Sequence, residues 1–173
     1  MEEQEAVALI KKGNMMGFDH IYKEYSGRIY GYLIRMVGRP SEAEDLTSEV
    51  FFRFYKGIGK YKDRGMLSSF IYRIAHNAAM DHFRKSKGII LSYDDNIQSN
   101  KGKKEESPYS EEEKMMLKAG MSRLSAKDRE LLIMFYISGL SIKEIAGSLG
   151  KSVTAVKVSL KRARDRLKME VPV

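Results

Sequence analysis

The sequence predicts an all-α protein in which a flexible linker joins two small helical domains. Apolar residues recur at steps of three and four along most of the 173 residues, and no stretch shows the alternation of a half-buried strand. This spacing stops between residues 88 and 110, where Gly, Ser, Asn, Asp, Lys and Glu dominate, a composition typical of linkers. We therefore expect one domain at residues 1–87, a linker at 88–110 and a second domain at 111–173, and the two domains need not touch.

The composition limits what the protein can do. A total of 31 Lys and Arg against 23 Asp and Glu gives a formal net charge of +8, which favours a polyanionic partner such as nucleic acid. The absence of cysteine excludes disulfides and thiolate metal sites and fits a reducing cytoplasm. Residues 1–5 are acidic, unlike a secretory signal, and no run approaches the ~20 apolar residues that cross a bilayer. We expect a cytoplasmic protein without membrane insertion.

Helical spacing divides the first domain into successive helices. In the first helix, Ala6, Leu9 and Ile10 share one face. The second helix follows Gly13 and carries a longer apolar stripe, which comprises Phe18, Ile21, Tyr22, Tyr25, Ile29, Leu33 and Val37. The third helix begins after Pro40, and its expected stripe is Ala43, Leu46, Val50 and Phe54.

The boundaries of the third helix follow from its capping and breaking residues. Ser41 and Glu44 predict a capping box, because a Ser and a Glu three residues later satisfy backbone donors for each other. Residues 57–65 interrupt the helical spacing and predict a loop. A further helix is expected from about residue 69 to residue 87.

Capping motifs predict four helices in the second domain. Boxes begin at Ser110, Ser125 and Ser141, and Ser152 can cap the last helix. In that helix, from residue 153 to about 169, the stripe expected to be buried is Val153, Val156, Leu160, Ala163 and Leu167. A short helix precedes it, and Gly150 lies between the two. This is a helix-turn-helix pattern, whose second helix lies in the DNA major groove with its N-terminal residues on base edges.

The charge of the last helix supports DNA binding. Seven basic residues and one acid lie between residues 151 and 168, and Lys and Arg supply the phosphate contacts that dominate affinity. Small residues at the start of the helix permit close approach. The candidate DNA-binding residues are Ser152, Thr154, Ala155, Lys157, Val158, Lys161 and Arg162. A basic helix face that is merely solvated remains the alternative, because the pattern has false positives.

Three upstream stretches make the pattern more specific. Together with the last helix, they resemble four motifs of the extracytoplasmic-function sigma factors of bacterial RNA polymerase, in the same order. The four stretches are residues 13–25, residues 41–51 (SEAEDLTSEVF), residues 69–84 (SFIYRIAHNAAMDHFR) and residues 156–164. The resemblance covers nearly the whole chain except the linker. It implies a sigma-type initiation factor whose partners are core RNA polymerase and promoter DNA, with the −10 element bound as a melted strand and the −35 element as a duplex. It also implies an anti-sigma factor as a further partner.

The resemblance implies roles for two more sets of residues. The helix after Pro40 would dock on a coiled coil of core polymerase through Asp45, Leu46, Glu49 and Val50. The −10 DNA would be held by Lys60, Tyr61, Arg64, Arg73, Asn77, Asp81 and Arg84, since Asn reads base edges, Arg holds phosphates and an aromatic ring stacks on an extruded base. The alternatives are an acid-rich helix start that the helix dipole favours, and a solvated polar stripe.

Two positions depart from the family pattern. Phe70 stands where the family often has Trp, and the chain has no Trp. Val158 and Ser159 stand where the family often has Ser and Arg. The promoter sequence of a relative therefore does not carry over to this protein.

Two other classes of function are weaker. His76 and His82 lie about 240° apart around a helix, so they do not converge on a metal. Without a Gly-rich phosphate loop, nucleophile elbow or carboxylate pair, we expect no enzyme and no cofactor. The alternative is a stand-alone helix-turn-helix regulator with an N-terminal sensing or dimerisation domain, which should bind its duplex unaided as a dimer. That alternative gives the acidic helix and the polar stripe no role.

Overall fold

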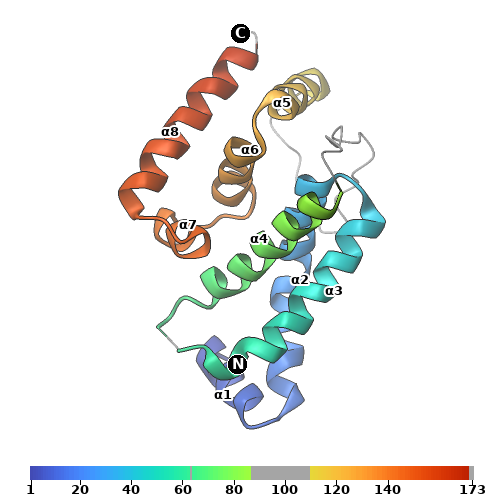
Figure 1. The fold of residues 1–173 in the computed structure, drawn as a ribbon, viewed down its shortest axis with the longest axis vertical. Helices are drawn as coiled ribbons and strands as arrows, with labels where there is room; N and C mark the ends of the chain where they lie inside the picture. Colours follow the sequence, from blue (N-terminus) through green and yellow to red (C-terminus); the bar gives the residue numbers. More distant parts are fainter. Residues whose placement is uncertain (63, 87–109, 172–173) are drawn as a thin grey trace.

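The computed structural model describes residues 1–62, 64–86 and 110–171, and within these ranges it contains helices and no strand (Figure 1). The predicted all-α class is confirmed. The N-terminal body comprises α1 (Glu3–Lys11), α2 (Met15–Val37), α3 (Pro40–Gly57), the short 3₁₀ helix η1 (Ile58–Lys60) and α4 (Leu67–Lys85). The C-terminal body comprises α5 (Glu111–Arg123), α6 (Ala126–Leu132), the π-helical turn η2 (Ile133–Ile137), α7 (Ile142–Leu149) and α8 (Val153–Glu170). Apart from Ser110, the expected linker lies outside the described residues.

In the N-terminal body, α1, α3 and α4 pack on the long helix α2. Gly17 lets α1 approach α2 closely, because a Cβ atom at this position would overlap the carbonyl oxygen of Ala6 and lie 2.9 Å from the Cβ of Leu9. The helix starts with Asn14, whose side chain accepts a hydrogen bond from the amide of Met16, and ends at Gly38 in the left-handed conformation.

The start and the end of α3 differ from the expectation. Arg39 is the N-cap and Pro40 the first helical residue, so the expected capping box of Ser41 and Glu44 is wrong. Proline has the φ angle of a helix and lacks the N–H that a cap would satisfy, so it starts the helix one residue before Ser41. At the other end, helical structure continues through η1 to Lys60, and the loop is shorter than the predicted 57–65.

The C-terminal body follows its capping motifs. Complete capping boxes occur at Ser110 and Ser141, Ser125 accepts from the amide of Asp128, and Ser152 accepts from the amide of Ala155. Gly150 turns the chain from α7 into α8 with φ 64°. The buried stripe of α8 begins later than expected. Its buried members are Val156, Leu160 and Ala163, whereas Val153 is 40% exposed because it directly follows the exposed turn.

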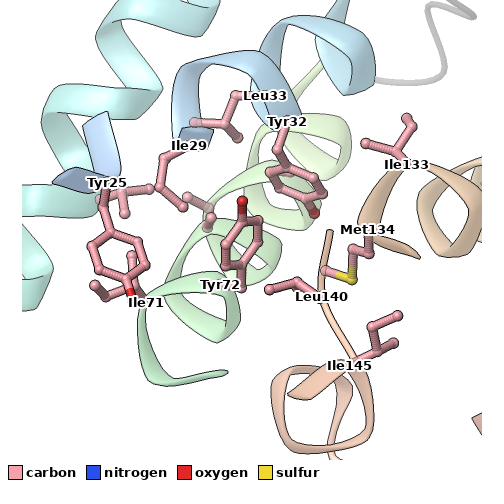
Figure 2. Close-up of a cluster of buried hydrophobic side chains, with 14 of the residues drawn as sticks. Tyr25, Ile29, Tyr32, Leu33, Ile71, Tyr72, Ile133, Met134, Leu140 and Ile145 are labelled. Atoms are coloured by element: carbon pink, nitrogen blue, oxygen red, sulfur yellow. The ribbon is translucent and has the colours of Figure 1, made fainter. Parts of the chain in front are cut away.

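The two bodies share one continuous hydrophobic core (Figure 2). Tyr32 of α2 and Tyr72 of α4 are buried together with side chains of the C-terminal body, namely Ile133, Met134, Leu140 and Ile145. Helices α4 and α7 lie side by side along this junction (Figure 1). The sequence left contact between the bodies open; in the structure they are packed together.

Candidate nucleic-acid interface

The outer side of α8 presents every residue that the sequence predicted for duplex DNA. All seven are exposed. The inner side is held by the buried stripe and by two side-chain contacts, from Arg166 to Asp128 of α6 at 2.6 Å and from Arg164 to the Tyr136 hydroxyl at 3.2 Å. The cations of the outer side differ from Arg164 and Arg166, since Lys157, Lys161 and Arg162 form no ion pair with any residue that the structure describes. They are available to an external polyanion.

The predicted polar stripe of α4 is only partly free. Asn77 and Arg84 are exposed, and the Arg73 guanidinium, also at the surface, donates a 2.6 Å hydrogen bond to the carbonyl oxygen of Gly147 in α7. Asp81 has a structural contact, because it accepts hydrogen bonds from Arg53 of α3 and from Arg84. Hydrogen bonds from these two guanidiniums lower the pKa of the Asp81 carboxyl, with Arg53 the larger cause. The carboxylate therefore orients two cations as well as facing solvent.

Tyr61 does not present its ring to solvent. The side chain is buried, its ring centroid lies 4.9 Å from that of Phe70, and its carbonyl oxygen accepts a 2.5 Å hydrogen bond from the Lys11 ammonium. Helix η1 turns the chain so that Tyr61 packs between α1 and α4. The expectation that this ring holds an extruded base is therefore not met in this conformation. Lys60 and Arg64, by contrast, are exposed.

The expected polymerase-docking residues on α3 separate into surface and core. Asp45 and Glu49 are exposed and Leu46 is half-buried, but Val50 is fully buried. Val50 packs in the core because it shares the inner stripe of the helix with Ala43. A groove of about 470 Å³ runs between α2 and α3 beside these acids; its lining includes Tyr30, Gly31, Glu44, Thr47 and Ser48.

Sequence reasoning missed two surface features. Phe52 is 61% exposed, with the Lys56 ammonium 5.3 Å from its ring centroid, and Tyr55 of α3 and Tyr22 of α2 are also exposed. In the sequence, Phe52 and Tyr55 lie outside the apolar stripe expected for the third helix, whereas Tyr22 belongs to the stripe expected for the second helix. A groove of about 790 Å³, lined mostly by the C-terminal body, has apolar walls that include Leu117, Met121, Leu132, Tyr136 and Leu167, and a basic rim of Arg35 from α2 with Lys114, Lys118, Arg164 and Lys168. No sequence pattern indicated it, since its residues come from five helical segments, α2, α5, α6, η2 and α8.

Each histidine lies beside a carboxylate of another residue. The pairs are His20 with Glu24, His76 with Glu130 and His82 with Glu42. The described part of the chain contains no cluster of three or more side chains that could hold a metal ion. Among the same residues, no helix is long and apolar enough to cross a bilayer.

Comparison with known proteins gives a consistent result. The family models of Sigma-70 region 2 and Sigma-70, region 4 match residues 21–89 and 114–167. The chain is 35% identical over 154 residues to the ECF RNA polymerase sigma factor SigM of Bacillus subtilis, covering 88% of this chain and 94% of SigM. It is 30% identical over 173 residues to SigW of the same organism, covering 94% and 92%.

Solved structures support the fold. CnrH, in complex with the cytosolic domain of CnrY, superposes with a TM-score of 0.73 at 18% identity, over 96% of this chain and 95% of CnrH. The sigma factor RpoE of Bartonella quintana, in complex with the anti-sigma factor NepR, superposes with a TM-score of 0.68 at 20% identity, over 88% and 95% of the two chains.

Proposed function

Because the chain belongs to the extracytoplasmic-function (ECF) RNA polymerase sigma factors, we propose that its two helical bodies divide promoter recognition between them. The protein is a sigma factor that directs transcription initiation with core RNA polymerase. In our proposal, residues 1–87 dock on core polymerase and hold the opened −10 element. Residues 111–173 read the −35 element as duplex, and the chain between them spans the distance.

The observation that carries this division is the two-sided character of α8. Its inner side is buried against its own body, and its outer side combines small and apolar residues with basic residues that form no ion pair within the described part of the chain. Cations at this position supply phosphate contacts, and short side chains near the helix start bring base edges within reach. The exposed residues proposed for −35 duplex are therefore those that the sequence indicated.

The N-terminal assignments follow the exposed residues. Arg73, Asn77 and Arg84 of α4, with Lys60 and Arg64 of the preceding loop, are proposed to hold the melted −10 strand, and Asp81 to position Arg84. Asp45, Leu46 and Glu49 are proposed to dock on a basic surface of core polymerase, with Val50 supporting them from the core.

The chain's proposed role is binding and strand holding, and nucleotide addition belongs to the polymerase. We place it in the cytoplasm, where core polymerase works. An anti-sigma factor is proposed as a further partner, because the solved RpoE structure above is a complex with the anti-sigma factor NepR. The apolar groove with its basic rim would suit an acidic amphipathic helix of such a partner.

A charge reversal tests the docking surface. Replacing Asp45 and Glu49 together by Lys is expected to weaken binding to core polymerase by at least about tenfold, since attraction becomes like-charge repulsion. Affinity for core is measured with the purified full-length protein, followed by transcription from promoters that the wild-type holoenzyme selects from a randomised library. Glu112→Lys, at an exposed position on α5, is the matched control. Undiminished core binding by the double variant would refute the docking surface, and a stand-alone regulator would bind duplex DNA without core.

A further inference from the structure

The loop that leads into α4, residues 59–66, carries two of the cations proposed for the −10 strand, Lys60 and Arg64. Among the described residues of this loop only Tyr61 is buried, so the loop is attached to the N-terminal body through Tyr61. Lys60 directly precedes this residue, and Arg64 follows it after three positions. The placement of Tyr61 therefore governs where the loop presents both cations.

Lys11, the last residue of α1, contacts Tyr61 in two ways. Its ammonium group donates a 2.5 Å hydrogen bond to the carbonyl oxygen of Tyr61 and lies 5.9 Å from the centroid of the Tyr61 ring. The second contact is within the range of roughly 6 Å over which a cation is attracted to an aromatic ring. A charged donor also forms a stronger hydrogen bond than a neutral one. One side chain of α1 thus holds both the backbone and the ring of Tyr61.

Both partners of this contact are held in place by other residues. The Tyr61 ring packs against α4, with its centroid 4.9 Å from that of the Phe70 ring. Helix α1 packs on α2, and the Tyr25 hydroxyl of α2 donates a 2.5 Å hydrogen bond to the Glu3 carboxylate of α1. Lys11 therefore links a helix that is packed on α2 to the loop before α4. Within the described part of the chain, Lys11 forms no ion pair, so no carboxylate competes for its ammonium group.

We propose that Lys11 is a positioning residue for the −10 strand, because by holding Tyr61 it orders the loop before DNA arrives. The inference rests on the proposed function, which assigns the −10 strand to Lys60 and Arg64 of this loop. A loop that is ordered in advance loses less conformational freedom on binding, so it binds more tightly. Without the Lys11 ammonium group, the loop is free to move, and the affinity for the melted strand falls.

Removal of the donor tests this role in the full-length protein bound to core polymerase. Lys11→Met keeps a long side chain without the ammonium group. It is expected to weaken holoenzyme binding to a promoter with a pre-melted −10 region about three- to tenfold, with core affinity unchanged. The promoter is one that the wild-type holoenzyme selects from a randomised library. Lys11→Arg restores a charged donor and should recover most of the loss. Lys12→Met, the matched control, removes the same charge from the next, exposed residue and should change the affinity less than about twofold.

A tryptophan at position 70 reports on the loop without DNA. The chain contains no Trp, and the rings of Phe70 and Tyr61 are in contact, so Phe70→Trp places a single fluorophore beside Tyr61. In the free full-length protein, Lys11→Met should increase the quenching of this Trp by acrylamide, whereas Lys11→Arg should not. A residue that only contacts DNA would leave the quenching of the free protein unchanged. The measurement therefore separates positioning from direct contact.

The salt dependence of binding provides a second separation. Loss of one phosphate contact to a single strand reduces the slope of log affinity against log salt concentration by about 0.7. Lys60→Met, which removes a cation proposed to touch the strand, should reduce the slope by about this amount. Lys11→Met should lower the affinity with the slope unchanged, because the contacts themselves remain.

Unchanged quenching or unchanged promoter affinity in Lys11→Met would overturn the positioning role. Equal losses of affinity in Lys11→Met and Lys12→Met would also overturn it, since they would reflect net charge alone. A slope reduced by about 0.7 in Lys11→Met would make Lys11 a direct phosphate contact instead. If the wild-type holoenzyme fails to bind the pre-melted promoter, the proposed function fails, while quenching of the free protein still reports whether Lys11 holds the loop.

Discussion

Several side chains proposed for recognition also make contacts within the fold. Arg73, which is proposed to hold the −10 strand, bonds α4 to α7, and Asp81 orients Arg53 and Arg84. Tyr61 packs beside Phe70 in place of facing solvent. Helix α8 is different, because its outer residues are exposed and make few contacts with the body behind them. Their chemistry is therefore a direct guide to the DNA that they are proposed to read.

Val158 is expected to contact the methyl group of a thymine in the −35 element. It is an apolar side chain, 44% exposed, on the outer side of α8, and apolar side chains recognise thymine through its C5 methyl. Val158→Ala should weaken holoenzyme binding about fourfold at promoters with that thymine, the value of roughly 0.8 kcal/mol for a lost methylene contact. The measurement replaces each −35 thymine by deoxyuridine, which lacks the methyl.

At the thymine that Val158 contacts, the loss of affinity from deoxyuridine and the loss from Val158→Ala should not add, because both remove the same contact. At that position deoxyuridine should weaken wild type but have little effect on Val158→Ala. Met169→Ala, at the exposed far end of α8, is the control and should respond to deoxyuridine as wild type does. Equal deoxyuridine penalties in wild type and Val158→Ala at every thymine would contradict the contact.

At the level of elements, the helices are fixed by local chemistry and joined by small residues. Serine caps begin α5, α6, α7 and α8, and Pro40 begins α3. Glycine appears where helices approach closely, at Gly17 between α1 and α2 and at Gly147 between α7 and α4. The Gly17 contact lies inside the N-terminal body, whereas the Gly147 contact lies between the two bodies.

Gly17 and Gly27 provide a matched pair of substitutions in α2. Gly17→Ala should lower the free energy of unfolding by roughly 1–3 kcal/mol, because the new methyl overlaps the backbone of α1. Gly27→Ala meets open space and should raise the stability by up to about 1 kcal/mol through helix propensity. Denaturant unfolding followed by circular dichroism measures both. A neutral Gly17→Ala would mean that α1 does not pack on α2 as described.

At the level of the whole molecule, the junction between the bodies depends on charge. Burial alone would raise the pKa of the Glu144 carboxyl, but hydrogen bonds from Ser68 and Ser141 outweigh it and hold the pKa below 4.5. A carboxyl whose pKa is lowered in the folded state stabilises that state above its unfolded pKa and loses this effect as pH falls through the lowered value. The share of this pKa lowering that comes from the Ser68 hydrogen bond exists only when the two bodies are packed together.

Glu144→Gln should therefore make closure less dependent on pH. Gln retains the cap on α7 and lacks the titrating charge. The fraction closed, measured by small-angle scattering from pH 7 to about pH 4, should be higher in wild type at neutral pH, and the difference should shrink below pH 4.5. Glu130 and His76 also face the junction and are the same in both proteins, so the comparison isolates Glu144. A constant difference across the pH range would contradict this contribution.

Local and long-range information divide clearly between sequence and structure. The sequence predicted the helical class, the caps at Ser110, Ser125, Ser141 and Ser152, and the exposed side of α8, because capping and amphipathic spacing are local properties. It misplaced the start of α3 because two competing local signals lie side by side there.

The sequence by itself determined the helices, the helix-turn-helix pattern and the family of this protein. The sequence placed Val50 both in the apolar stripe and among the docking residues, and the tertiary structure decided for the core. Only the tertiary structure decided that Tyr61 is buried and that Arg73 bonds to α7. It alone revealed that the two bodies close over α4. Periodicity indicates that a helix side is buried or polar, but it does not indicate which distant segment covers it. That partner is fixed by three-dimensional packing, which joins Ser69 to Gly147 across 78 residues (147 − 69).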